Sequence, residues 1–146
     1  MSISVEIILE SSDDLLSGLN RLLPQLSTTA SPLDSAALAA IVDSSASTLF
    51  VAFDDGVIVG TLTLVIVSIP TGLRAWIEDV VVDEAARGAG VGAALSRAAL
   101  EEARRRNVRS LELTSRPSRE AANAMYVKLG FVQRNTNVYR FSFEKP

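Results

Sequence analysis

A glycine-rich segment in the middle of the chain joins a run of β-branched residues to a helical pattern. In this segment, Arg87-Gly88-Ala89-Gly90-Val91-Gly92, glycines alternate with small residues. Glycine permits a tight turn and lets backbone N–H groups come close to a bound group. The helix that begins there adds a positive dipole end and unpaired donors. We therefore expect an anion-binding turn, with Arg87 adding a full positive charge at its edge.

Two other anion-binding turns compete with this interpretation. A P-loop needs a Lys-Ser/Thr pair after its last glycine, and Ala93-Ala94 stands there instead. Residues 88–93 also fit a relaxed dinucleotide fingerprint, with Glu112 roughly where a ribose-binding carboxylate is expected. That turn should follow its strand directly, whereas residues 83–87 intervene here and a hairpin precedes the strand. The sequence disfavours a dinucleotide site, and glycines that serve only the turn remain an alternative.

Hydrophobic periodicity and turn residues predict the element order β-α-α-β-β-β-α-β-α-β-β. The expected strands are Ser4–Leu9, Thr48–Asp54, Val57–Ser68, Arg74–Val82, Leu111–Thr114, Phe131–Gln133 and Asn137–Phe143. Four helices are expected. The first runs from a cap at Ser11 or Ser12 to Pro24, which ends or kinks it, and the second runs from Ser31-Pro32 to Asp43. The third runs from about Gly90 to Arg106, and the fourth runs from Ser118 to Leu129, with Gly130 as its stop.

A mixed α/β (α+β) fold accounts for this order, with a largely antiparallel sheet and helices on both faces. The parallel pair should be the two strands on either side of the central helix, because a strand-helix-strand unit returns in the same direction. A length of 146 residues predicts a single domain over 1–146, and a hydrophobic fraction of 48% is enough for a packed interior.

Charge and missing residue types narrow the chemistry. A net charge of −3 and a pI near 5.0 argue against a nucleic-acid binder, which normally shows a basic face. The chain contains no Cys and no His. Disulfides, zinc-thiolate sites and Ser-His-Asp triads are therefore excluded, and no metal site is predicted. Acid–base chemistry has to use carboxylates, Tyr, Lys or water.

Nothing in the sequence predicts a membrane association. The N-terminus has no basic region followed by an apolar core, so a signal peptide is not expected. The longest apolar run, residues 57–69, is interrupted by Gly60, Thr61, Thr63 and Ser68 and is too short to cross a bilayer. We expect a cytoplasmic protein.

Two segments resemble the GNAT superfamily of N-acetyltransferases. Ile77 to Leu95 resembles its acetyl-CoA motif, with an Arg-x-x-Gly-x-Gly signature at Arg87, Gly90 and Gly92. Ala122 to Phe131 resembles its second motif, which ends Tyr-x-x-x-Gly-Phe. The resemblance implies a GNAT-like acyl-CoA N-acyltransferase fold, acetyl-CoA as cosubstrate, no metal, and an amine acceptor.

The resemblance also implies a place for each part of acetyl-CoA. The pyrophosphate would be held by backbone N–H groups of Gly88, Ala89, Gly90, Val91, Gly92 and Ala93, beside Arg87. The pantetheine arm would lie like an added strand against Val80, Val81 and Val82. The N–H near Val80 would polarise the thioester carbonyl and stabilise the tetrahedral oxyanion. Direct attack by an amine would then expel the CoA thiolate.

Tyr126 matches the family's tyrosine that protonates this thiolate. The alternative is a core tyrosine that hydrogen-bonds to a neighbour. Asn123 precedes it by one helical turn and could share the cofactor-facing side. Many family members place their asparagine further upstream, where this chain has Arg119 or Ala122.

Two carboxylates precede the proposed pantetheine stretch, and strand alternation sends them to opposite faces. A carboxylate at the position of Glu78 occurs in relatives that act on polyamines or amino sugars, so Glu78 is our candidate base, with Asp79 second. A carboxylate at the rim, or one paired with Arg74, is the alternative.

The preferred function is an N-acetyltransferase acting on a primary amine in a small molecule, an amino acid or a peptide. The rival is a non-catalytic acyl-CoA-binding sensor or regulatory module. Both need the glycine turn, but only the enzyme needs Tyr126 and Glu78. The sequence does not identify the acceptor or the oligomeric state. The apolar strand expected at Val138 to Phe143 could pair across a homodimer.

Overall fold

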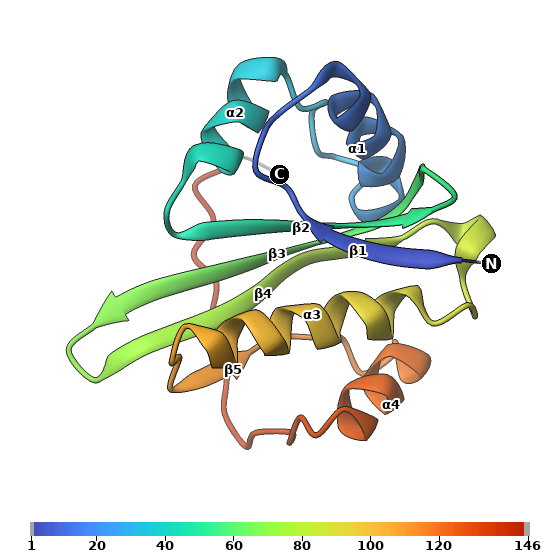
Figure 1. Ribbon diagram of the computed structural model, residues 1–146. Helices are drawn as coiled ribbons and strands as arrows, with labels where there is room; N and C mark the ends of the chain where they lie inside the picture. The colour runs from blue at the N-terminus through green and yellow to red at the C-terminus, as the bar shows by residue number, and fades with distance from the viewer. Residues whose placement is uncertain (1, 145–146) are drawn as a thin grey trace.

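One sheet of five strands separates two layers of helices in the computed structural model, which describes residues 2–144 (Figure 1). The strands lie in the order β1-β2-β3-β4-β5. Neighbours from β1 to β4 are antiparallel, and β4 and β5 are parallel. The strands are β1 (Ile3–Ile7), β2 (Ser47–Asp54), β3 (Val57–Ile69), β4 (Gly72–Val82) and β5 (Ser110–Glu112).

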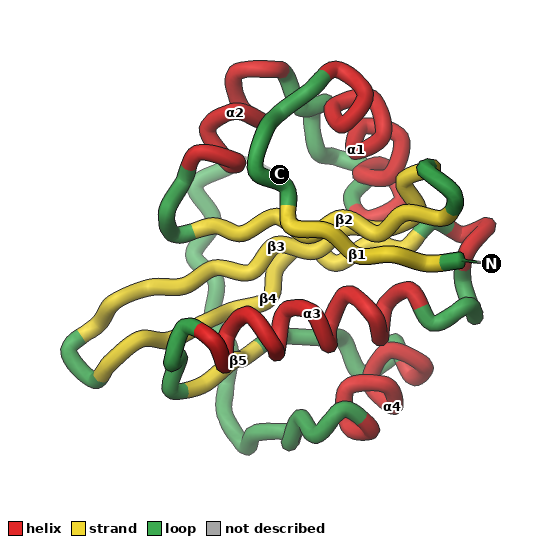
Figure 2. The backbone as a smooth tube through the Cα atoms, in the orientation of Figure 1, coloured by secondary structure: helices red, strands yellow, loops and turns green. Residues whose placement is uncertain are grey.

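Helices cover both faces of the sheet, and each face has its own apolar core (Figure 2). Helices α1 (Asp13–Leu26) and α2 (Ser35–Asp43) lie on one side, and α3 (Val91–Arg105) and α4 (Glu120–Lys128) lie on the other. A short 3₁₀ turn, η1 (Glu84–Ala86), connects β4 to the glycine-rich segment. Within the described residues, no helix is both long and apolar enough to cross a membrane.

The predicted architecture is confirmed in its main features. The sheet is mixed and mostly antiparallel, and its parallel pair, β4 and β5, flanks α3 as expected. The hairpin between β2 and β3 turns at Asp55 and Gly56, which take φ values of 49° and 83°. Two successive residues with positive φ match the right-handed twist of the flanking strands.

Three helix boundaries differ from the prediction. Pro24 does not end α1, which continues to Leu26, and beyond it the Ser27 N–H still bonds to the Leu23 carbonyl at 3.0 Å. Helix α2 begins after an Asp34 cap and not at Ser31-Pro32. The side chain of Asn20 explains this, since it bonds both the N–H and the C=O of Leu33 at 2.8 and 2.9 Å and holds the connection against α1.

Helix α4 begins at Glu120, and not at Ser118, without a capping side chain.

The two strands predicted at the C-terminal end, Phe131–Gln133 and Asn137–Phe143, are wrong for this structure. Residues 131–143 carry no regular secondary structure (Figure 2). The Phe131 N–H bonds back to the Tyr126 carbonyl at 3.0 Å, which ends α4 and turns the chain away. A β-strand needs a partner for its backbone groups, and no strand of the described chain pairs with this segment.

Candidate functional site

Strand β4 contains a β-bulge at Asp79, three residues before its end at Val82. Between the pairs Thr61–Val81 and Thr63–Glu78, β4 has one residue more than β3. Asp79 takes the left-handed conformation there, with φ 51°. An extra residue bends its strand and redirects the following side chains and backbone groups.

The bulge changes which face of the sheet each side chain occupies. Ala75 and Ile77 belong to the core under α3, but Val81 belongs to the core under α1 and α2. The prediction that Glu78 and Asp79 point to opposite faces rested on uninterrupted alternation, and the bulge interrupts it at Asp79. Both carboxylates are exposed.

Around and beyond the bulge, one edge of β4 is free. The parallel ladder with β5 runs only from the Arg74–Ser110 pair to the Trp76–Glu112 pair. Strand β4 continues to Val82, so over residues 77–82 its β5 side has no strand partner among the described residues. A free edge of this kind can accept an extended molecule as an additional strand.

The glycine-rich turn follows this edge after the short η1 connection and presents unpaired N–H groups. Gly88 and Gly90 have φ values of 83° and 81°, and a Cβ on either would meet no atom within 4 Å. Helix α3 starts without a side-chain cap, and its first bond runs from the Ala94 N–H to the Gly90 carbonyl at 3.0 Å. The N–H groups of residues 91–93 are therefore free at the positive end of the helix.

The segment before the turn is anchored by α1, which the sequence analysis did not anticipate. Asp83 accepts hydrogen bonds from Arg21 at 2.5 Å and from the Ala85 N–H at 3.2 Å, and these bonds hold the pKa of its carboxyl below the usual value. Gln25 accepts a bond from the Glu84 N–H at 2.9 Å. In the sequence, the polar residues Arg21 and Gln25 near the end of α1 were the only signal for this contact, because they lie far from Asp83 and Glu84 along the chain.

The second predicted motif, Tyr-x-x-x-Gly-Phe, is the C-terminal cap of α4. Gly130, with φ 104°, donates to the Val127 carbonyl, and Phe131 donates to the Tyr126 carbonyl, each at 3.0 Å. The Tyr126 and Phe131 rings pack edge to face with centroids 5.6 Å apart. This combination is a Schellman motif with its hydrophobic contact.

Tyr126 is 6% exposed, and its hydroxyl makes no hydrogen bond with the described residues. The alternative interpretation from the sequence was a core tyrosine that hydrogen-bonds to a neighbour. Tyr126 is buried as that interpretation requires, but the hydrogen bond is not found. Burial raises the pKa of the Tyr126 phenol, and the positive charge of Arg119 offsets part of this rise. The phenol is thus kept in its neutral, proton-donating form.

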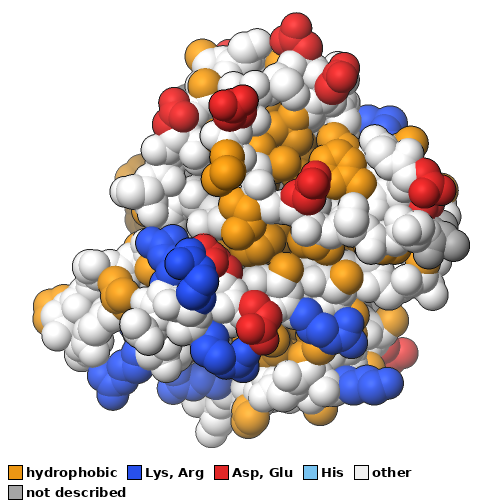
Figure 3. All heavy atoms as spheres, viewed as in Figure 1, with side chains coloured by type: hydrophobic (Ala, Val, Ile, Leu, Met, Phe, Trp, Pro, Cys, Tyr) orange, Lys and Arg blue, Asp and Glu red, His pale blue; other side chains and the backbone are white. Residues whose placement is uncertain are grey.

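A groove of about 760 Å³ between α3 and α4 continues from the glycine turn. Ala93 and Met125 line it, and Met125 also lies 3.8 Å from where a Cβ of Gly92 would be. Three cationic side chains line the same groove: Arg97, Arg104 and Lys128. On the face shown in Figure 3, Lys and Arg side chains gather mainly over the α3–α4 half of the molecule and acidic ones over the α1–α2 half.

The remaining predicted site residues are distributed around this turn and edge. Glu78 has no ion pair in the described chain, and Arg74 pairs with Glu112 at 2.8 Å, so the suggested Arg74–Glu78 pair is wrong. Arg87 is exposed beside Glu84, with 3.8 Å between the charged atoms.

The side-chain nitrogen of Asn123 donates to the Arg116 carbonyl at 3.0 Å, which orders the loop before α4.

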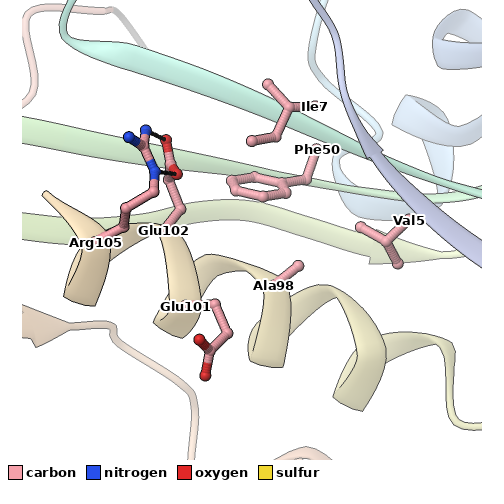
Figure 4. A pocket seen from close by; sticks show the side chains of 7 residues that line it. All are labelled: Val5, Ile7, Phe50, Ala98, Glu101, Glu102 and Arg105. Atoms are coloured by element: carbon pink, nitrogen blue, oxygen red, sulfur yellow. Dashed lines mark hydrogen bonds and ion pairs between the residues drawn. The ribbon is translucent and has the colours of Figure 1, made fainter.

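A second groove, of about 540 Å³, lies between α3 and the β1–β2 side of the sheet (Figure 4). Val5, Ile7 and Phe50 point toward α3 across it, and the Glu102–Arg105 ion pair lies at its edge. It shares no lining residue with the glycine turn or with β4. The bulge, the free edge, the turn and α4 therefore form the candidate site.

Comparisons with known proteins agree on one family. Residues 16–131 match the family model described as "Acetyltransferase (GNAT) family". No match was found among curated proteins. A putative acetyltransferase from Agrobacterium tumefaciens str. C58 is similar over 95% of this chain and 99% of its own, with 32% identity and a TM-score of 0.83.

Two further structures share the fold at 20% identity. An aminoglycoside acetyltransferase from an uncultured soil metagenomic sample has a TM-score of 0.86, with 98% of this chain and 97% of that chain covered. The glucosamine-6-phosphate N-acetyltransferase from Arabidopsis thaliana has a TM-score of 0.84, with 99% and 100% covered.

Proposed function

This chain belongs to the acetyltransferase (GNAT) family, and we propose that it moves the acetyl group of acetyl-CoA to a primary amine. The observation that carries the proposal is the free edge of β4, followed after η1 and the glycine-rich turn by the uncapped N-terminus of α3. Acetyl-CoA has an extended amide-bearing arm joined to a pyrophosphate. The free edge of β4 matches the arm, and the helix N-terminus matches the pyrophosphate, in the same order.

The turn fits a pyrophosphate in shape and charge. Because a Cβ at Gly88 or Gly90 would meet nothing, the backbone faces open space at both residues. The free N–H groups of residues 91–93 donate to phosphate oxygens, with Arg87 beside them. The groove between α3 and α4 begins at Ala93, and its cations Arg97 and Lys128 can neutralise further phosphate charge.

The edge of β4 would orient the pantetheine arm and the thioester. Backbone groups of Val80, Val81 and Val82 would pair with the amides of the arm, and the N–H near Val80, which follows the bulge, would polarise the thioester carbonyl. Acetyl-CoA supplies an activated acyl group and a good leaving group. The amine attacks the carbonyl carbon through a tetrahedral intermediate, and the C–S bond then breaks.

Tyr126 would donate the proton that the departing thiolate requires. Like any tyrosine, it is neutral at physiological pH, and burial raises the pKa of its phenol further. No hydrogen bond of its hydroxyl is found within the described chain. A neutral donor with a free hydroxyl is what this step needs.

Glu78 would accept the proton that the amine loses, directly or through water. It is exposed and free of ion pairs in the described chain, which leaves the carboxylate available. Asp79 is the second candidate, since it lies at the bulge itself.

The acceptor is proposed to be a small amine, with amino sugars first in the test panel. Two proteins with this fold are an aminoglycoside acetyltransferase and a glucosamine-6-phosphate N-acetyltransferase, and both names specify amino-sugar acceptors.

The test follows release of free thiol from acetyl-CoA with a panel of amino sugars, polyamines, amino acids and peptides. Tyr126→Phe should lower kcat by about 100-fold or more while acetyl-CoA affinity stays the same, because only the proton transfer is lost. Tyr139→Phe is the matched control, since Tyr139 is 88% exposed in the C-terminal segment. Tight acetyl-CoA binding without turnover of any amine would favour the non-catalytic sensor instead.

The pH dependence gives an independent readout. Since the pKa of Tyr126 is raised, the phenol remains protonated to a higher pH than an ordinary tyrosine. The kcat of the wild-type protein should therefore fall only at a pH higher than that at which an ordinary tyrosine ionises, as the donor is lost. This alkaline fall should be missing from the residual activity of Tyr126→Phe.

A further inference from the structure

The only tryptophan of the chain lies in β4 and belongs to neither apolar core. Trp76 is half-buried, whereas its neighbours Ala75 and Ile77 are buried in the core under α3. Because side chains alternate along a strand, Trp76 lies on the opposite face of the sheet, which carries α1 and α2. Its indole N–H is not among the fully buried polar atoms, and no hydrogen bond of this group is found within the described residues. The indole is therefore available to a ligand.

The face of the sheet around Trp76 is only partly covered. The β3 residue directly opposite Trp76 is Val65, which is also half-buried and outside both cores. Further toward the hairpin, Val67 and Ile69 are 36% and 37% exposed. Figures 1 and 2 show the hairpin end of β3 and β4 extending beyond the α1–α2 layer. This half of the sheet therefore leaves an apolar surface partly open.

Trp76 shares this open face with Glu78, the candidate base. Glu78 pairs with Thr63 of β3 as Trp76 pairs with Val65, and both precede the bulge. Two residues of strand span about 7 Å, so the indole lies next to the Glu78 carboxylate on the side away from the bulge. From Trp76 to Val80, where we place the thioester carbonyl, the strand covers at most about 13 Å. The indole is therefore within reach of an acceptor that occupies the site.

The charges beside Trp76 give this surface a direction. Glu112 of β5 lies opposite Trp76, and two arginines neutralise it: Arg74 at 2.8 Å and Arg134 at 3.0 Å. Glu78 is exposed and has no ion pair in the described chain. The unpaired negative charge therefore lies on the bulge side of the indole. A cationic acceptor would turn its ammonium groups toward Glu78 and leave its uncharged part on Trp76.

We propose that the indole of Trp76 binds a ring of the acceptor, and that the acceptor is an amino sugar of at least two rings. This inference rests on the proposed acetyl transfer. The indole offers a flat apolar face and one N–H donor, and an amino sugar offers a face of C–H groups, hydroxyl oxygens and ammonium groups. With the reacting amine at Val80 and Glu78 in between, a single sugar ring does not extend to Trp76. The ring on Trp76 is thus a second ring, which sets specificity and takes no part in proton transfer.

A linear polyamine would use this surface differently. It carries ammonium groups that suit Glu78, but it has no ring face to stack on the indole and no hydroxyl to accept its N–H. Removal of the indole should therefore affect a two-ring amino sugar more than a single-ring amino sugar or a linear polyamine. This difference separates the proposed acceptor class from the other amines.

The first experiment compares KM values for neamine, which has two rings, for glucosamine and for spermidine. Trp76→Ala should raise the KM for neamine by about 10-fold or more, because the stacked ring loses its partner. The kcat and the KM values for glucosamine and acetyl-CoA should stay close to those of the wild type. Trp76→Phe keeps an aromatic face and should restore much of the affinity for neamine. Ile69→Ala, at the far end of the same face, is the matched control, and circular dichroism checks that each variant is folded.

The second experiment measures binding without turnover. Because Trp76 is the only tryptophan, the intrinsic fluorescence of the wild-type protein reports directly on its surroundings. With CoA in place of acetyl-CoA no acetyl group is transferred, so the acceptor can be titrated at equilibrium. Neamine should give a saturable change in the tryptophan emission, and glucosamine and spermidine should give a smaller one.

The two experiments separate this inference from the proposed function. An unchanged KM for neamine in Trp76→Ala, or an equal rise for all three acceptors, would overturn the role of Trp76. Turnover of other amines without neamine, or a larger effect on spermidine, would overturn the acceptor class. If the wild-type protein acetylates no amine at all, the proposed function fails, and the titration still decides: a saturable response to neamine supports the binding role of Trp76, and no response overturns it.

Discussion

At the scale of single residues, the candidate site depends on backbone conformation more than on side chains. Gly88 and Gly90 take positive φ values that L side chains rarely adopt, and each faces open space where a Cβ would be. A side chain there costs about 1–2 kcal/mol in backbone strain. It would also occupy the space in front of the free N–H groups, which is where we propose that the pyrophosphate binds.

Gly90→Glu should therefore abolish CoA binding, which isothermal calorimetry can measure. The new carboxylate enters the pyrophosphate site, and at about 4 Å from a phosphate charge its repulsion costs about 1–4 kcal/mol. Gly56→Glu is the matched control, because Gly56 has φ 83° and open space too but lies in the β2–β3 hairpin. Unchanged CoA affinity of the Gly90 variant would refute the proposed location of the pyrophosphate.

At the scale of elements, the position of α3 depends on a glycine in the strand beneath it. A Cβ at Gly60 in β3 would lie 2.9 Å from Cγ1 of Val91, 3.1 Å from Cδ1 of Leu95 and 3.3 Å from the Val81 carbonyl oxygen. The first turn of α3 can thus pack directly on the sheet. This close approach places the free N–H groups of α3 beside the end of β4.

Gly60→Ala should lower the free energy of unfolding by about 1–3 kcal/mol, because the methyl group overpacks this contact. It should also weaken CoA binding, since the first turn of α3 has to move outward. Adding Val91→Ala removes the nearest obstructing carbon and should restore part of both quantities. Urea unfolding and calorimetry provide the measurements, and strictly additive losses in the double variant would contradict the steric explanation.

At the scale of the whole molecule, two helical layers cover the faces of the sheet, but the C-terminal segment remains exposed. Aromatic side chains rarely remain so exposed on an isolated chain, because burying each one is worth about 1.5–3 kcal/mol. If copies of the chain associate through this segment, the free energy of unfolding should increase with the fraction of the protein that is associated.

The Tm of the full chain should rise by about 3–5 °C over a hundredfold increase in protein concentration, because association stabilises the folded state by mass action. A chain ending at Arg134 lacks the exposed apolar residues of the C-terminal segment. Its Tm should be independent of concentration, and it should still unfold cooperatively. Scanning calorimetry of both proteins checks the prediction, which fails if the full chain also melts at one temperature throughout.

The sequence alone determined the features that depend on neighbouring residues. The Ser12 cap, the Asp55-Gly56 hairpin, the uncapped glycine turn and the Gly130 stop of α4 are all as predicted. Each is decided by backbone preferences or hydrogen bonds within a few residues. The alternation of strand and helix patterns likewise predicted the mixed sheet and its parallel pair.

Only the tertiary structure decided features whose partners are distant in the chain. The bulge at Asp79 appears only in the pairing of β4 with β3, and the bond from Arg21 to Asp83 spans 62 residues. The C-terminal segment shows the limit most directly. Its alternating pattern predicted a strand, but a strand forms only where another strand accepts its hydrogen bonds. The glycine turn could be recognised from the sequence, whereas the edge beside it and the α1 side chains anchoring it required the folded chain.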